Sequence, residues 1–221
     1  SVGINGDARA VAHALAERLG SRTLACQSDA AGRAARIRAE KEAWESELSA
    51  WTQERDPFST EIARDSRNMH PREVLRELER AMPADAMVAT DIGNICSVSN
   101  SYLRFDRPRS MFAAMSFGNC GYALPTIMGA KCAAPDRPAI AYAGDGAWAM
   151  SMVEIMTAVR HNIPVTAVVF HNRQWGAEKK NQVDFYNRRF VAGELESESF
   201  AGIAIAMGAE GIVVDKGITF A

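Results

Sequence analysis

Two side chains with oxygen atoms, the carboxylate of Asp145 and the amide of Asn172, each follow shortly after a short apolar run. Residues 138–143 precede the first side chain and residues 163–170 precede the second. Both runs have the length and branching of buried parallel strands, and residues 147–161 between them are typical of a helix. A right-handed crossover places two such strands side by side or nearly so. We therefore expect Asp145 and Asn172 to emerge together at the carboxyl edge of a sheet, where open α/β sheets bind ligands.

The groups expected at that edge suit a divalent cation and an anion. Carboxylate and amide oxygens are hard ligands of the kind that Mg²⁺ and Ca²⁺ prefer. Gly146 lets the backbone come close to a ligand and begins the following helix, whose free N–H groups and positive dipole end attract an anion. Because Mg²⁺ shares its remaining positions with phosphate oxygens and water, the pattern predicts a diphosphate site bridged by a metal.

Other interpretations of the same residues are less favoured. Asp145 could simply cap a helix in a strand-to-helix turn, without any ligand. The spacing to Asn172 at the end of the next strand favours the metal site over this turn. A dinucleotide site or a P-loop is not indicated, because the chain contains neither G-x-G-x-x-G nor G-K-[ST].

The triplet at residues 144–146, followed after 25 residues by Asn172, resembles the thiamine-diphosphate (ThDP) binding motif. That motif is usually written as GDG and, after a similar spacing, NN. His171 stands where the first Asn is usual, while Asn172 keeps the Asn that is the metal ligand in the family. The resemblance implies that Asp145, Asn172 and the backbone carbonyl of Gln174 hold Mg²⁺.

Residues 91–97 and 111–130 resemble two further blocks of the pyrophosphate-binding domain, in the acetohydroxyacid synthase branch of ThDP enzymes. In that branch the first block contacts the diphosphate and the second cradles the aminopyrimidine. Gly118 matches the carbonyl that faces the ring's amino group, and Cys120 takes the place of the apolar residue that bends the cofactor. The motif and the two blocks together imply these cofactor-binding residues: Asn94, Ile95, Gly118, Asn119, Cys120, Gly144, Asp145, Gly146, Ala147, Asn172, Gln174 and Trp175.

Within that branch, residues 91–97, 111–130 and 171–182 most resemble the acyltransferases that use sulfoacetaldehyde and phosphate. The resemblance implies small-molecule substrates and a homodimer or homotetramer formed through a pyrimidine-binding domain. The Glu that activates the cofactor lies in that domain, so we assign no catalytic acid or base here and expect these residues alone to be inactive. Two other classes stay open: a ThDP enzyme with different chemistry, such as an acetolactate synthase or a decarboxylase, and a non-catalytic module of the same fold.

The composition of the 221 residues indicates neither nucleic acid nor membrane as a partner. The net charge is −2, and no apolar run approaches the thickness of a bilayer. The four cysteines form no C-x-x-C pair, which favours reduced thiols over a zinc or redox site. We therefore expect a cytoplasmic protein.

We predict three parts along the chain. Residues 1–28 resemble the end of a central domain, with a strand at residues 1–6 and a helix at residues 8–19. Residues 29–57 are charged and predict a helical linker. Residues 58–221 are the predicted pyrophosphate-binding domain, which we expect to be cut short at its C-terminus. Its fold class is α/β, a doubly wound and mainly parallel sheet with helices on both faces.

Local signals predict several boundaries within these parts. Asp7 is a candidate cap for the first helix, and the pair at residues 56–57 is expected to end the linker helix. A helix is expected at residues 71–82. Strands are expected at residues 86–90 and 209–215.

Overall fold

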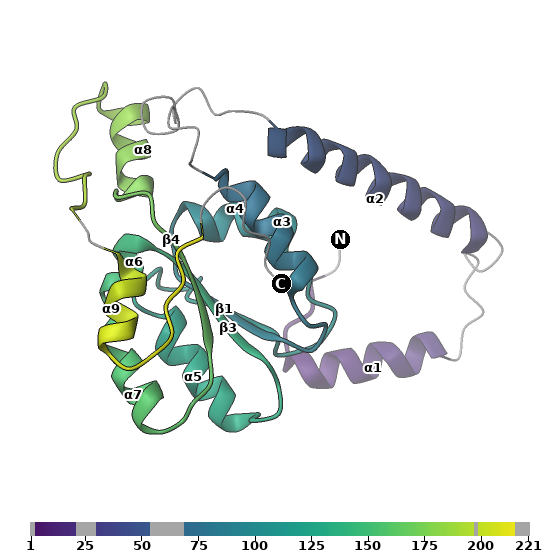
Figure 1. The fold of residues 1–221 in the computed structure, drawn as a ribbon. Coiled ribbons are helices and arrows are strands. Elements are labelled where there is room, and N and C mark those ends of the chain that lie inside the picture. The colour runs from purple at the N-terminus through teal and green to yellow at the C-terminus, as the bar shows by residue number, and fades with distance from the viewer. Residues whose placement is uncertain (1–2, 21–29, 54–68, 197–198, 215–221) are drawn as a thin grey trace. The chain divides into compact units, whose positions relative to one another are not determined.

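The computed structural model describes residues 3–20, 30–53, 69–196 and 199–214. Contacts divide the chain into two compact units, Ser1–Ala50 and Trp51–Ala221. Figure 1 shows the order of the helices and strands along the chain. None of the helices in the described ranges combines the length and the apolar character needed to cross a bilayer.

The first unit contains α1, Ala8–Gly20, and most of α2, Ala30–Gln53. Both predicted helices are confirmed, and Oδ1 of Asp7 caps α1 by accepting a backbone N–H three residues on, at 2.9 Å. Residues 3–5 do not form the predicted strand. A strand needs a ladder partner, and the described part of this unit contains no other strand. Residue 6 is a bend, while residues 1–2 and the helix end expected at residues 56–57 lie outside the described residues.

The second unit is built on a sheet of four parallel strands in the order β2-β1-β3-β4. The strands are β1, Met87–Thr90; β2, Met111–Ala113; β3, Ala139–Gly144; and β4, Thr166–Phe170. All of β1 and the first five residues of β3 are buried, which explains why these segments are continuous apolar runs in the sequence. The parallel α/β fold is confirmed, and the two strands that precede Asp145 and Asn172 are direct neighbours.

Helices cover both faces of this sheet. Figure 1 shows α3 and α4 on one side and α5 and α7 on the other. The helices of this unit are α3, Pro71–Ala81; α4, Asn94–Tyr102; α5, Ala123–Ala133; α6, Asp145–Ala149; α7, Ile155–Arg160; α8, Gly176–Phe185; and α9, Phe200–Ala206. Ala89 and Ala141 pack against α5 on one face, whereas the Tyr142 hydroxyl lies 2.6 Å from Ser99 Oγ of α4 on the other. This alternation is the period of two expected of a strand.

The predicted helix at residues 71–82 is confirmed by α3. His70 caps it by accepting the N–H of Arg72, and Glu73 completes a capping box by accepting the N–H of His70. Pro71 is the first residue of the helix, where its missing N–H costs nothing.

The single helix predicted at residues 147–161 is wrong. The structure has α6, then a 3₁₀-helix at Met152–Glu154, then α7. The N–H groups of Met150 and Ser151 donate to carbonyls three residues back, at 3.2 and 3.1 Å, instead of four residues back. This tighter turn ends α6, and Ser at the break is a poor residue for a helix interior.

The strand predicted at residues 209–215 is also wrong for residues 209–214, while residue 215 lies outside the described part. Gly208 has φ +88° and closes the C-terminus of α9. An added Cβ at Gly211 would lie 2.2 Å from the Ala201 carbonyl oxygen, so the chain packs against the backbone of α9. Ile212 is 76% exposed, and the segment therefore adds no strand to the sheet.

Candidate metal and cofactor site

Asp145 joins the two halves of the motif. It lies at the end of β3 with a side chain that is only 2% exposed. Its Oδ1 accepts the N–H of Gly146 at 2.9 Å, and its Oδ2 accepts the N–H of Arg173 at 2.6 Å. A turn in which Asp145 only capped α6 would not need the second bond. The carboxylate therefore fixes the loop after β4 to the start of α6.

The loop after β4 is a tight turn. Oδ1 of the exposed Asn172 accepts the N–H of Gln174 at 3.3 Å. Arg173 has φ +59°, a conformation that costs a non-glycine residue on the order of 1 kcal/mol and is common at functional sites. The turn thus places Asn172 and Gln174 on either side of Arg173, whose N–H donates to the Asp145 carboxylate.

His171 also lies beside this carboxylate. Its Nε2 is 4.0 Å from Oδ2 of Asp145, and its side chain is 26% exposed. The ring packs edge-to-face on Phe200, with the centroids 5.0 Å apart. The residue that departs from the usual motif therefore packs between the Asp145 carboxylate and α9.

Two glycines mark close approaches around this loop. A Cβ on Gly146 would lie 2.8 Å from the indole ring of Trp175, so the ring covers the start of α6. A Cβ on Gly176 would lie 3.4 Å from Nδ2 of Asn94 and 3.5 Å from Nδ2 of Asn172. The side chains of Asn94 and Asn172 therefore approach the same point at the start of α8.

The N-termini of α4, α6 and α8 thus meet at the carboxyl edge of the sheet. Asn94, Asp145 and Gly176 are the first residues of these helices. Ile95 and Ala147 of the first turns are buried, so they offer the edge their backbones more than their side chains. Free N–H groups at helix starts suit an anion.

The second block lies beside this edge and carries the predicted aminopyrimidine contacts. Gly118 and Gly121 have φ +79° and +78°, values that favour glycine. Sγ of Cys120 donates weakly to the carbonyl of Ile92 at 3.9 Å. Burial raises the pKa of the Cys120 thiol, and the charges of Asp91 and Glu178 raise it further. The thiol stays protonated at neutral pH, which suits an apolar lining residue.

We call residues 171–175, the loop after β4 that carries two of the predicted metal ligands, the metal loop. A segment that the sequence did not indicate is bonded to this loop. We call residues 191–195 the return segment. Its Gly193 carbonyl accepts the N–H of Trp175 at 2.9 Å, and its Leu195 N–H donates to the Arg173 carbonyl at 2.8 Å. These bonds form an antiparallel bridge in which Glu194 lies opposite Gln174.

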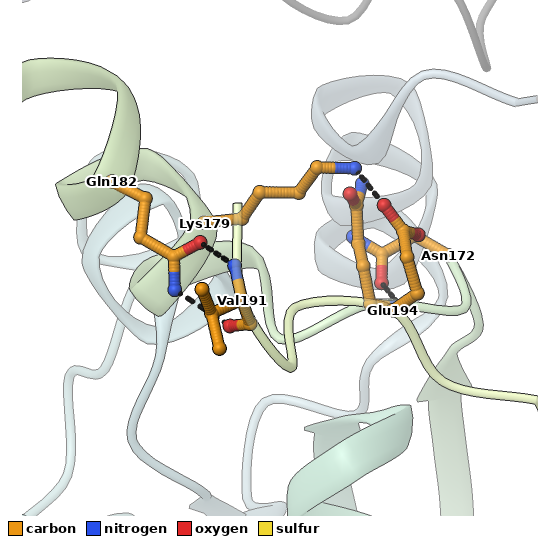
Figure 2. A network of polar contacts seen from close by, with 6 residues as sticks. Asn172, Lys179, Gln182, Val191 and Glu194 are labelled. Carbon is orange, nitrogen blue, oxygen red and sulfur yellow. Dashed lines mark hydrogen bonds and ion pairs between the residues drawn. The ribbon is translucent and has the colours of Figure 1, made fainter. Parts of the chain in front are cut away.

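Side chains of α8 reinforce the return segment. Figure 2 shows Lys179 paired with Glu194, and Gln182 bonded to Val191. The Gln182 amide donates to the Val191 carbonyl and accepts the Val191 N–H, both at 2.9 Å. No spacing rule predicts such a contact between a helix and an irregular segment. Gly176 was missed as well, although a glycine at a helix start close to Asn172 was an available signal.

Comparison with known proteins defines the class. Residues 91–221 match the family described as thiamine pyrophosphate enzyme, C-terminal TPP binding domain. The match covers more than half of the chain, so the chain belongs to the thiamine pyrophosphate enzymes. A solved ThDP-dependent 4-hydroxybenzoylformate decarboxylase of Rhodococcus jostii RHA1 shares the fold, with a TM-score of 0.62 and 23% identity over 66% of this chain and 28% of that chain.

Some relatives have a much higher sequence identity to this chain than the solved decarboxylase does. The sulfoacetaldehyde acetyltransferase of Alcaligenes xylosoxydans xylosoxydans is 73% identical over 97% of this chain, and that of Castellaniella defragrans is 71% identical over 98%. The chain spans 37% of the length of each. The acetolactate synthase isozyme 3 large subunit of Escherichia coli is 31% identical over 67% of this chain and 26% of its own length.

Proposed function

We propose that this chain is the C-terminal part of a ThDP- and Mg²⁺-dependent sulfoacetaldehyde acetyltransferase, which converts sulfoacetaldehyde and phosphate to acetyl phosphate and sulfite. The observation that carries the cofactor assignment is the Asp145 carboxylate bonded to the N–H of Arg173, because it brings the two halves of the motif together. The substrate assignment is supported by relatives of that name at 73% and 71% identity.

The donors present fit Mg²⁺. Asp145 offers carboxylate oxygens that each accept one N–H in the structure, so further lone pairs are free for a cation. The Asn172 side chain and the Gln174 carbonyl are the other proposed ligands. Three hard oxygen donors leave positions for diphosphate oxygens and water, which is the usual coordination of Mg²⁺.

The rest of the edge fits the cofactor. Gly176 carries no Cβ at the start of α8, where the Asn94 side-chain amide also lies, while the Trp175 ring covers Gly146 at the start of α6. Residues 118–120 are the proposed aminopyrimidine contacts. When bound, ThDP supplies carbanion-stabilising chemistry at a carbonyl carbon. The residues of this chain bind and orient it, and we assign no proton-transfer step to them.

We further propose that the enzyme is a cytoplasmic homodimer or homotetramer, in which a pyrimidine-binding domain contributes the activating Glu. A site made from two domains is in keeping with the division proposed here, in which this chain contributes metal and diphosphate ligands.

The test is product analysis with the full-length protein. Sulfoacetaldehyde and phosphate should yield sulfite and acetyl phosphate in equal amounts, while pyruvate should yield little acetolactate. Acetolactate as the main product, with no sulfite released, would move the protein to the second candidate, acetolactate synthase. That candidate is favoured by more distant relatives named acetolactate synthase, which are 27–31% identical to this chain.

Cofactor binding distinguishes the proposed enzyme from a non-catalytic module of the same fold. Trp148 is 4% exposed, whereas Trp175 is partly exposed and lies over Gly146. ThDP with Mg²⁺ should therefore quench the fluorescence of Trp175, and Trp175→Phe should remove most of the signal. A wild-type protein with no ThDP-dependent quenching and no turnover would favour the module.

A further inference from the structure

Asp91 is a buried carboxyl group that the metal site does not use. It follows β1 directly, and its residue is 0% exposed. Its Oδ1 accepts the N–H of Tyr122 at 2.6 Å and that of Ala123 at 3.3 Å. Among the residues that the structure describes, its Oδ2 has no hydrogen-bond partner. A buried oxygen without a partner is unfavourable for stability and requires an explanation.

The two bonds of Asp91 cap a helix that has no cap of its own. Tyr122 is the N-cap residue of α5, and its side chain makes no capping bond. A negative carboxylate at the start of an 11-residue helix also interacts favourably with the helix dipole. Asp91 therefore replaces the usual Ser, Thr or Asp cap, but from another element of the fold.

The predicted aminopyrimidine contacts lie directly before the N-terminus of α5, which Asp91 caps. Residues 118–121 run directly into Tyr122, and two of them are glycines with positive φ. Such a backbone has few conformational restraints of its own. Asp91 holds it at residues 122–123, and the Ile92 carbonyl holds it at Cys120.

The protonation state of Asp91 is set by two opposing effects. Burial is the larger effect and raises the pKa of Asp91 above its ordinary value, while the hydrogen bonds from the N–H groups of Tyr122 and Ala123 oppose it. The short bond to Tyr122 is typical of a charged acceptor. An Asn at this position would keep one acceptor oxygen and lose the charge.

We propose that Asp91 is a positioning residue of the cofactor site, whose carboxylate fixes the start of α5 and thereby holds the backbone of residues 118–122 at the carboxyl edge of the sheet. This inference rests on the proposed function, because it assigns those residues to the cofactor. Asp91 acts through the backbone and touches no ligand itself.

The test uses Asp91→Ala, Asp91→Asn and the control Ser99→Ala in the full-length protein. Ser99 is also buried, but its hydroxyl bonds to the Cys96 carbonyl and the Tyr142 hydroxyl and to none of residues 118–123. Asp91→Ala should raise the calorimetric Kd for ThDP with saturating Mg²⁺ by about tenfold or more. The KM for sulfoacetaldehyde at saturating cofactor should not change. Asp91→Asn should recover most of the affinity, and Ser99→Ala should bind as the wild type does.

Amide exchange provides a readout that needs no cofactor. Asp91→Ala should speed exchange at Tyr122 and Ala123 and leave the amides of β3 unchanged. If Asp91→Ala does not fold, Asp91→Glu takes its place, since an extra methylene displaces the acceptor and should weaken ThDP binding in the same way.

Three results would overturn the inference. One is a folded Asp91→Ala or Asp91→Glu protein with wild-type ThDP affinity. Another is an equal loss in Ser99→Ala, which would indicate general destabilisation. The third is a wild-type protein that does not bind ThDP, and that result would also overturn the proposed function.

Discussion

At the scale of single residues, the absence of a side chain at Gly146 has a reason that the sequence does not reveal. A glycine after the motif's Asp indicates a ligand that approaches the backbone. The structure adds a protein neighbour, because the Trp175 ring occupies the space where a Cβ would lie. The sequence predicted Asp145 and Asn172 from residue type and spacing. It did not predict this contact, because the packing of a ring from the next loop depends on how that loop folds.

We expect Gly146→Ala to lower the free energy of unfolding by about 1–3 kcal/mol, because the added methyl forces the Trp175 ring to move. Trp175→Ala should relieve the clash, so the double variant should be more stable than the two single effects predict. Denaturant titration of the four proteins measures this coupling.

Gly144→Ala is the matched control for that experiment. Gly144 has φ −71°, and its added Cβ would meet nothing within 4 Å. It should therefore unfold close to the wild type. Additive effects of Gly146→Ala and Trp175→Ala would argue against the close contact.

At the scale of secondary-structure elements, the return segment stabilises the metal loop through its backbone. Exposed ion pairs such as Lys179 with Glu194 contribute about 1 kcal/mol or less. The two bonds between Gln182 and Val191 and the bridge to residues 173–175 make the larger contribution. The elements of this unit therefore hold the metal loop from both sides, with Asp145 on one side and the return segment on the other.

Gln182→Ala should loosen the return segment without unfolding the sheet. We expect faster amide exchange at Val191 and Trp175, and a Mg²⁺ affinity lowered by several-fold, since about 1 kcal/mol of ordering is lost. Lys180→Met is the control, because the pair that Lys180 forms with Asp184 on the same helix does not contact the return segment. Equal exchange at Trp175 in both variants would contradict this role.

The elements also show what local sequence signals can predict. Strands β1 and β3 follow from buried apolar runs, which are local properties. The apolar run of β4 was expected to be buried as well, but its first two residues are exposed and the other three are only partly buried. The break in the helix after Asp145 was missed because apolar residues continue across it. Residues 209–214 have the composition of a strand, but the chain turns back along α9 and offers them no neighbouring strand. Both errors concern tertiary packing, which a local pattern does not contain.

At the scale of the whole molecule, the parallel sheet gathers the starts of α4, α6 and α8 at one edge. Every parallel strand ends at that edge, so the following loops and helices must begin there. The Asp145 carboxylate lies where β3 and β4 meet, and it is the group most directly placed to hold a cation against a diphosphate. Mg²⁺-dependent cofactor binding is therefore the property on which the proposed function of this edge most depends.

The most direct test is calorimetry of ThDP binding to the full-length protein, with and without Mg²⁺, for the wild type and Asp145→Ala. Asp136→Ala serves as the control, since Asp136 is an exposed carboxylate that precedes β3 at the opposite edge. We predict tight binding to the wild type and to Asp136→Ala only when Mg²⁺ is present, and no measurable binding to a folded Asp145→Ala. Equal ThDP affinity with and without the Asp145 carboxylate would contradict the account.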